Sequence, residues 1–539
     1  MQRLFFILLV LSAFACQRAG DHADKMIFRY NESAGVSSLD PAYSRNLENI
    51  WVCNMLYNGL VEVDDSLNIK PSIAERWTID STGTVYRFYL RDDVFFHESE
   101  AFPNKQDRRV VASDFVYSFN RILDRKLSSP GSWVFGAVAT ENPFRAIGDS
   151  IVEIQLEKQF PPFLGLLGMK YCSVVPHEAV EMYGDNFRMN PVGTGPFKFN
   201  FWIENTRLVL IKNENYFEVD DSGANLPYLD AVSVSFIPDK SAAYLDLVKG
   251  NFDFMSGLHS SYADELITGD GELVELYSDR FYLQKHPFLK TDYLGFMVND
   301  SLAKGSPWLN VDLRRAINYA INRADMVRYL RNNVYTPGTA GFIPKGMPGY
   351  RENSGFSYNP DSVRACIERA GYGNGKKLPK LTLSTTSDYV DLCEFVQHQV
   401  SQFGFEVKVD VLPASVHREL TARGEIEFFR KSWLADYPDD ENFMALFYSP
   451  NQSPAGPNYS HFSDPAFDDL YLAALATTNQ KERNKLYTQM DSLMMLQAPI
   501  VPLYYDVVMR FVSNKVSGLD ESPTNILDLR HVKIELDEE

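Results

Sequence analysis

The sequence has few of the residues and patterns that mark catalytic or metal centres. Nine histidines and five cysteines occur in 539 residues, and none has the Cys-x-x-Cys or Cys/His spacing of a zinc site. There is no Gly-x-Ser-x-Gly elbow, no His-Glu-x-x-His helix and no glycine-rich phosphate loop. The segment His97-Glu98-Ser99-Glu100 lacks a second histidine, which favours a charged loop. We therefore expect no catalytic residue, no metal and no cofactor.

Positive charge is also scarce. The chain has 52 lysines and arginines against 71 aspartates and glutamates, for a formal charge of −19. Nucleic acids and anionic membrane surfaces are bound by clustered basic residues, so this balance argues against a nucleic-acid partner. No apolar run reaches the roughly 18 to 20 residues that a membrane-spanning helix needs.

The amino end has the pattern of an export signal. Arg3 precedes an apolar run from Leu4 to Val10, and Ala13 and Ala15 lead into Cys16. This order predicts a signal peptide over residues 1–15 and resembles a bacterial lipoprotein cleavage site, in which the cysteine is acylated. We therefore expect an exported protein of the cell envelope or periplasm, anchored to a membrane through a lipid on Cys16. Ala13 and the bulky Phe14 depart from the usual pattern, so an ordinary signal peptide with an incidental cysteine stays open.

The remaining cysteines are Cys53, Cys172, Cys366 and Cys393. An oxidising compartment permits a bridge such as Cys366 with Cys393, but buried free thiols are the more common state in a chain of this size. We expect buried free thiols, and a bridge between Cys366 and Cys393 stays open.

Periodicity indicates a mixed α/β protein. Alternating apolar residues predict strands, and apolar residues three and four apart predict helices. The strands are expected around Tyr86–Leu90, Val152–Leu156 and Val232–Phe236, each with one wet face, and the helices over Leu313–Ile321 and Leu486–Met494, the second beginning at a cap on Asn479. Because no repeat or long linker divides the chain, we expect interleaved domains with several crossings between lobes, which would form a multi-strand hinge.

A series of short motifs runs through the whole chain. In order they are Leu39-Asp40-Pro41, Leu56–Leu60, Ile73–Trp77, Ala112–Ser118, Pro191–Lys198, Asn213–Phe217, Leu313–Arg323, Tyr358-Asn359-Pro360 and Ala498–Tyr504. Taken together they resemble the family 5 extracellular solute-binding proteins, which include oligopeptide- and dipeptide-binding proteins. Each motif alone is weak, and the order of all of them carries the resemblance.

The resemblance implies a two-lobed, class II-like binding protein with an additional domain in one lobe. It places the first lobe at residues 27–62, 185–285 and 498–539, the additional domain at 63–184 and the second lobe at 286–497. It also implies a monomer that captures a peptide or other small molecule between closing lobes and delivers it to the permease and ATPase subunits of an ABC importer. On this view the protein is not an enzyme.

The segment Ser432–Asp439 is similar to the Trp-x-Ala-Asp-Tyr motif of the family. The resemblance makes Asp436 the partner of a peptide's α-ammonium group and Trp433, with Leu434 and Ala435, part of the pocket wall. A carboxylate enclosed between lobes costs several kcal/mol unless a cation satisfies it, which favours an amine-bearing ligand. Two alternatives stay open: Asp436 caps a turn before Pro438, or it pairs with Arg430.

The expected carboxyl end of the ligand is less well defined. Arg430 matches a position at which an oligopeptide-binding member carries an arginine able to receive the peptide carboxylate, whereas two other basic positions fall at Asn318 and Val390. Aromatic side chains line ligand sites well, so Trp133, Tyr504 and Tyr505 are further candidates for the pocket wall, with a core position equally open. A nickel chelate, haem, a sugar or an opine stays open as the ligand, as does a lipid-anchored enzyme or chaperone built on the same scaffold.

Overall fold

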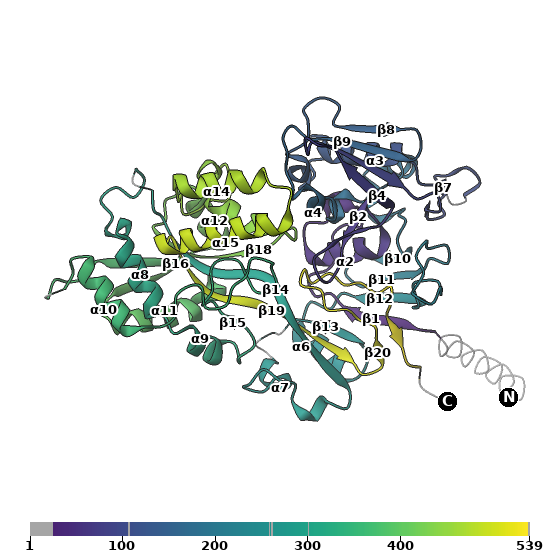
Figure 1. Cartoon of the computed structure of the whole chain (residues 1–539). Helices are drawn as coiled ribbons and strands as arrows, with labels where there is room; N and C mark the ends of the chain where they lie inside the picture. The colour runs from purple at the N-terminus through teal and green to yellow at the C-terminus, as the bar shows by residue number, and fades with distance from the viewer. Residues whose placement is uncertain are drawn as a thin grey trace, which may run out of the picture.

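The computed structural model describes residues 25–105, 108–257, 259, 262–299, 301–373 and 375–536. The predicted signal peptide and Cys16 lie outside these residues. The described chain forms two lobes joined by two long strands, which run from one lobe into the other (Figure 1). No helix in the described ranges is long and apolar enough to cross a membrane.

One large mixed sheet extends through both lobes. Its order is β10-β11-β12-β1-β13-β19-β14-β18-β16-β17, with β15 beside β19. The strands are β10 (Phe197–Ile203), β11 (Arg207–Lys212), β12 (Ala231–Ser235), β1 (Ile27–Asn31), β13 (Phe254–Ser256), β19 (Ile500–Ser513), β14 (Phe281–Phe296), β18 (Phe428–Leu434), β16 (Lys380–Thr385), β17 (Glu406–Val411) and β15 (Thr336–Pro337). The pairs of β1 with β12 and β13, and of β16 with β17 and β18, are parallel.

Strands β14 and β19 connect the lobes. The first half of β14, up to Pro287, pairs with β19, and its second half pairs with β19 again from Thr291 and also with β18 from Lys290. The register shifts between Pro287 and Thr291. Because proline has no N–H to donate to a ladder, the pairing is weakest at this crossing. Two strands with an interrupted ladder therefore form the connection at which the lobes can move.

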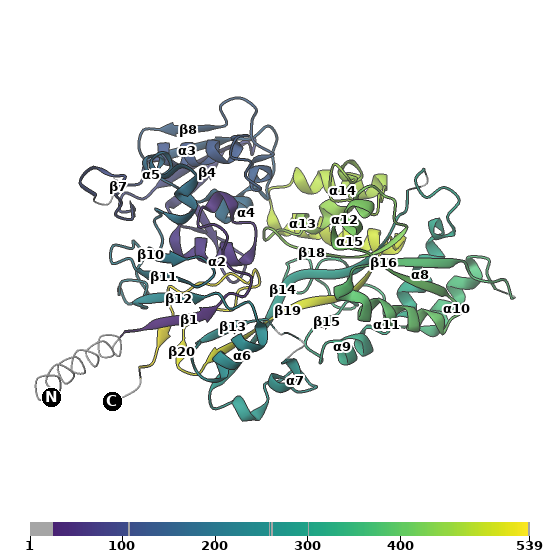
Figure 2. The same cartoon turned by 180° about the vertical axis from the view of Figure 1, so that it is seen from behind.

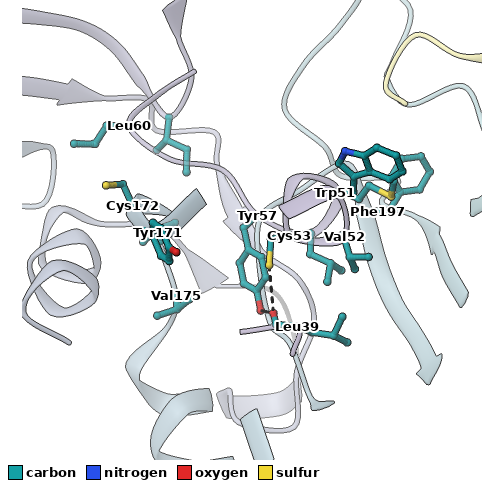
Figure 3. Packing of buried hydrophobic residues seen from close by; sticks show 14 of the residues in the cluster. Leu39, Trp51, Val52, Cys53, Tyr57, Leu60, Tyr171, Cys172, Val175 and Phe197 are labelled. Carbon is teal, nitrogen blue, oxygen red and sulfur yellow. Dashed lines mark hydrogen bonds between the residues drawn. The ribbon is translucent and has the colours of Figure 1, made fainter. Parts of the chain in front are cut away.

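The first lobe and the added domain share one core. The added domain contains a four-stranded sheet, β4 (Ala74–Ile79), β5 (Val85–Leu90), β9 (Ile151–Gln155) and β8 (Phe144–Ile147), with α3 (Ala112–Leu123), α4 (Phe163–Leu167) and α5 (His177–Tyr183). Buried residues run without a break from these elements into α2 (Leu47–Leu56), β1 and β12. Figure 3 shows part of this cluster around Tyr57, whose hydroxyl donates to the Leu39 carbonyl at 3.0 Å.

The second lobe places helices on both sides of the β18 region of the sheet (Figures 1 and 2). The helices are α8 (Val311–Ala320), α9 (Arg323–Leu330), α10 (Pro360–Arg369), α11 (Val390–Ser401), α12 (Ala414–Ala422), α13 (Glu441–Met444), α14 (Pro465–Leu475) and α15 (Gln480–Gln497). Two separate cores lie against the sheet, one beneath α8 and α11 and the other beneath α14 and α15. A smaller core under α6 (Lys240–Val248) and α7 (Ala263–Leu266) lies beside β14 and β19. The two-lobed α/β fold with an additional domain is confirmed, and the residue boundaries given for the domains stay a prediction.

Most local predictions are confirmed. The expected strands are β5, β9 and β12, the expected helices are α8 and α15, and the Asn479 side chain caps α15 by accepting from the Lys481 N–H at 3.0 Å. The wet face predicted for β9 was wrong at Glu153. This carboxylate is buried because Arg87 of β5 donates to it at 2.8 Å and Arg145 of β8 lies 3.5 Å away. All four described cysteines are buried free thiols, as expected.

Gly193 and Gly195 allow two backbone segments to approach closely. A Cβ at Gly193 would lie 1.9 Å from the Leu56 carbonyl oxygen, and one at Gly195 would lie 2.4 Å from that of Met55. The segment therefore lies directly on the carboxyl end of α2. The backbone N–H of His97 also holds this segment, because it donates to the Gly193 carbonyl at 2.7 Å. The structure therefore assigns these glycines to a close approach of backbone to backbone.

We predict that Gly193→Ala destabilises the protein, because a backbone carbonyl cannot move away from the new methyl group without shifting α2. The expected loss is about 1 to 3 kcal/mol of unfolding free energy. Gly269→Ala is the matched control, since no heavy atom lies within 4 Å of its added Cβ. Urea unfolding followed by circular dichroism would compare the two, and equal midpoints would contradict the close approach.

Candidate functional site

The segment with the Trp-x-Ala-Asp-Tyr pattern lies where β18 leaves the sheet. Trp433 is the cross-strand neighbour of Thr291 on β14, and its half-buried ring packs against the core beneath α14 and α15. Its indole Nε1 donates to the Asn442 side chain at 2.8 Å. The Ala435 N–H donates to the Leu289 carbonyl at 2.8 Å, which holds the chain to β14 for one more residue. Asp436 is therefore the first residue of the segment to leave the sheet.

The Asp436 side chain is surrounded by protein atoms but reached by solvent. It is exposed, yet desolvation by its surroundings raises the pKa of its carboxyl group above the ordinary value, while a hydrogen bond from Asn442 lowers it by less. A carboxylate that lies at the surface but close to many protein atoms has both properties. Within the described ranges no lysine, arginine or histidine lies within ion-pair distance of Asp436, so neither Arg430 nor any other described cation neutralises it.

Asp436 faces the first lobe and its added domain. Its charge raises the pKa of Tyr171, a residue between α4 and α5 whose own burial is the larger cause of a pKa of about 12. Figure 3 shows Tyr171 near Val175 and Cys172, and all three belong to the core shared by the first lobe and the added domain. Tyr437, which follows Asp436, packs into that same core. Pro438 lies against Gly165 of α4, because a Cβ added to Gly165 would lie 3.3 Å from the proline ring. The carboxylate thus lies beside the line along which the two lobes meet.

A cleft follows this line. It has a volume of about 440 Å³ and takes its walls from both bodies. Leu67, Tyr86 and Leu164 line it on the side of the added domain, and Pro438 and Arg483 line it on the side of the second lobe. The loop that carries Asp436 contributes Pro438 and Asp439 to this cleft, and Asp436 itself lies two residues before its lining.

Arg430 is occupied by the protein itself. Its guanidinium donates to the Asp292 carboxylate and lies 3.1 Å from the centre of the Tyr389 ring. Lys290 contacts the same carboxylate at 3.1 Å and also Asp506 at 2.8 Å. Arg430 and Asp292 are both buried, and burial lowers the pKa of the arginine to about 10, which leaves it charged at neutral pH. These four charged residues form what we term the hinge charge cluster.

The other predicted site residues lie in different surroundings. Trp133 is 44% exposed and belongs to a short 3-10 helix of the added domain, two residues after Gly131, against which the Tyr171 ring packs. Leu434 is 38% exposed at the end of β18. Tyr505 is fully buried and its hydroxyl donates to the Gly341 carbonyl at 2.7 Å, so here it packs in the core instead of facing the cleft. Tyr504 is also buried, beside Tyr335.

Several residues of the site were missed from the sequence. Asn442 joins Trp433 to Asp436, and it lies in the polar run Asp439–Asn442 directly after the motif, which could have signalled it. Tyr171, Asp292, Lys290 and Asp506 gave no such signal. Their role depends on contacts between distant parts of the chain.

A search with family models matches residues 68–455 to the bacterial extracellular solute-binding proteins, family 5. The chain belongs to this family. The matched segment covers nearly all of the added domain, strands β10 to β13 of the first lobe, the whole of β14 and most of the second lobe, including the loop with Asp436.

Curated relatives cover nearly the whole of this family 5 protein. A dipeptide-binding protein of Escherichia coli K12 is 25% identical over 500 residues, which are 89% of each chain. Heme-binding protein A of Haemophilus influenzae is 26% identical over 487 residues, which are 87% of this chain and 85% of the relative. Among solved structures, the ABC transporter-associated periplasmic binding protein DppA of Helicobacter pylori in complex with the peptide STSA superposes with a TM-score of 0.73 at 27% identity, covering 95% of this chain and 99% of DppA.

The hinge charge cluster yields a stability prediction. Asp292→Ala leaves Arg430 with no carboxylate partner and Lys290 with only one, and breaking a buried pair in this way costs about 3 to 5 kcal/mol. Asp361→Ala is the control, because its pair with Arg364 is exposed on both sides and contributes less than about 1 kcal/mol. Thermal unfolding of both variants would measure the difference. Equal melting temperatures for the two variants would show that the cluster does not stabilise the folded protein.

Proposed function

We propose that this protein is the peptide-capturing component of an ABC importer and that Asp436 binds the ligand's α-ammonium group. The observation that carries the proposal is the state of this carboxylate: crowded, at the meeting line of the lobes, and without an ion-pair partner among the described residues. A peptide amino terminus would supply the missing positive charge. Such charge-assisted hydrogen bonds are among the strongest polar contacts in proteins.

The supporting comparisons are of two kinds. A relative of similar length is named for dipeptides, and the Helicobacter pylori structure contains a peptide. The Haemophilus influenzae relative is named for haem, so haem is the competing ligand. The site favours the peptide, because haem carries propionate groups and would bring further negative charge to a wall whose free group is already a carboxylate.

Capture would follow from closure of the lobes about β14 and β19. A ligand favours the closed state only by its higher affinity for that state. With Asp436 on the second lobe and Tyr171 and Trp133 on the other side, a peptide placed between them would contact both bodies. Main-chain hydrogen bonds to such a peptide would be independent of its side chains, which permits broad specificity.

We predict that Asp436→Asn weakens binding of trialanine to pentaalanine peptides by about 2 to 5 kcal/mol, because the neutral amide leaves the buried ammonium unpaired. Isothermal titration calorimetry would measure the loss. Asp221→Asn, on an exposed loop of the first lobe, is the control and should bind as the parent does.

N-acetylated versions of the same peptides sharpen this test. They lack the ammonium group, so the parent protein should bind them weakly and Asp436→Asn should no longer discriminate between free and acetylated forms. An undiminished affinity of the variant for free peptides would remove Asp436 from the anchor role. Binding of haemin by the parent, with no binding of peptides, would replace the proposed ligand.

We also propose export and a lipid anchor on Cys16, from the signal-like amino end. The predicted consequence is that the mature chain begins at Cys16 with added acyl mass and partitions with membranes. Cys16→Ser should release it into the soluble fraction. Mass spectrometry of the mature chain, with fractionation of cells expressing both forms, would decide this, and an unmodified Cys16 within a longer mature chain would contradict it.

A further inference from the structure

The second-lobe wall carries charges that could read the far end of a bound ligand. A peptide held by its ammonium at Asp436 and extended along β18 would place its later residues toward Arg430, at most about 20 Å away at 3.3 Å per strand residue. A free α-carboxylate ending in this region needs a cation to replace its hydration. Only the cations of this wall could supply that charge.

Strand register explains why Arg430 is not available. Arg430 pairs across the ladder with Leu294, and Asp292 pairs with Ser432, so the two charged residues are diagonal neighbours on the same face of the sheet. The side chain of Asp292 has no exposed surface and that of Arg430 is 8% exposed. The guanidinium is thus held between an internal carboxylate and the Tyr389 ring.

The neighbouring cations are engaged in the same way. Lys290 of β14 bridges Asp292 and Asp506 of β19, and Arg331, the residue after α9, contacts Asp391 of α11 at 3.0 Å. This part of the wall carries three positive and three negative charges and is therefore neutral. The cations are Lys290, Arg430 and Arg331, and the carboxylates are Asp292, Asp506 and Asp391. Each of these described cations has a protein carboxylate for a partner.

Two further cations lie elsewhere. Lys431 is on the opposite face of β18, with its ammonium 3.5 Å from the centre of the Tyr459 ring. Arg45 belongs to the first lobe, and its charge acts on the Tyr171 hydroxyl, the same group that senses Asp436. Arg45 therefore lies at the amino end of the proposed ligand and not at its far end.

We infer that Asp292 fills, from within the protein, the position that a ligand carboxylate would otherwise take on Arg430, so that this protein selects peptides by their amino end and does not read a free carboxyl terminus. The inference rests on the proposed function and narrows it to a ligand class: peptides of variable length, or with a blocked carboxyl end, that present a free α-ammonium group. Recruiting Arg430 to a ligand would require breaking a buried ion pair, which is strongly unfavourable.

The test compares peptides that differ only at the carboxyl end. Titration calorimetry of the full-length protein with trialanine to pentaalanine, each as the free acid and as the carboxyl-terminal amide, should give affinities within about threefold of one another at every length. A preference for the acid greater than this at any length would overturn the inference while leaving the amino-end proposal intact. Failure of all free-amine peptides to bind would instead refute the proposed function, and the inference with it.

A second variant asks whether Arg430 takes part. The double substitution Asp292→Asn, Arg430→Gln removes both members of the pair, so no net charge is gained, and Lys290 keeps Asp506 as its partner. Removing both partners is far less disruptive than removing one. The ratio of acid to amide affinity should equal that of the parent protein. A fall in acid binding with amide binding unchanged would show that Arg430 does receive the ligand carboxylate.

Discussion

The structure depends on a pair of long strands that belong to both lobes. Strands β14 and β19 lie at the centre of the large sheet. The strands from β10 to β13 continue the sheet from β19, and β18, β16 and β17 continue it from β14. Their ladder is interrupted between Pro287 and Thr291, where a residue without an N–H meets a shift of register. The hinge charge cluster lies at this break, because Lys290 is inside it and Asp292 is one residue beyond its end. The interruption and the buried charges therefore lie within a few residues of each other. Movement at the crossing is limited by the ion pairs of the cluster, because breaking a buried ion pair costs several kcal/mol.

The position of Asp436 follows from this arrangement. Hydrogen bonding to β14 continues as far as Ala435, which fixes the direction in which the chain leaves the sheet. Tyr437 and Pro438 then contact the first core and α4, so the loop touches both lobes at once. Asp436 has a rigid residue before it and an anchored residue after it. Its carboxylate also accepts a hydrogen bond from the Asn442 side chain.

The sequence predicted the helices and strands well, but it did not predict which side chains contact one another. Period-two and helical patterns located β5, β12, α8 and α15, because each buries one face against a single layer. Glu153 was misjudged, since alternation cannot show that arginines on two adjacent strands will cover a carboxylate. Tyr504 and Tyr505 are both buried although they are successive residues of one strand, because β19 is covered on both faces. Asp292 and Arg430 are 138 residues apart, and nothing local to either indicates the other.

Asp436 and the hinge charge cluster therefore differ in how their charges are balanced. On the second lobe the cations of the hinge charge cluster are neutralised internally, whereas Asp436 is not. Bringing the lobes together without a ligand would remove solvent from an ionised carboxylate whose pKa is already raised by its surroundings, at a cost that rises as the gap narrows. In the proposed function, an ammonium group in the gap would convert this cost into a gain, and a carboxylate elsewhere on the ligand would find no unpaired cation in the cluster. In the proposed function, the unpaired Asp436 would oppose closure without a cation, and the paired Arg430 would leave closure insensitive to a carboxylate on the ligand.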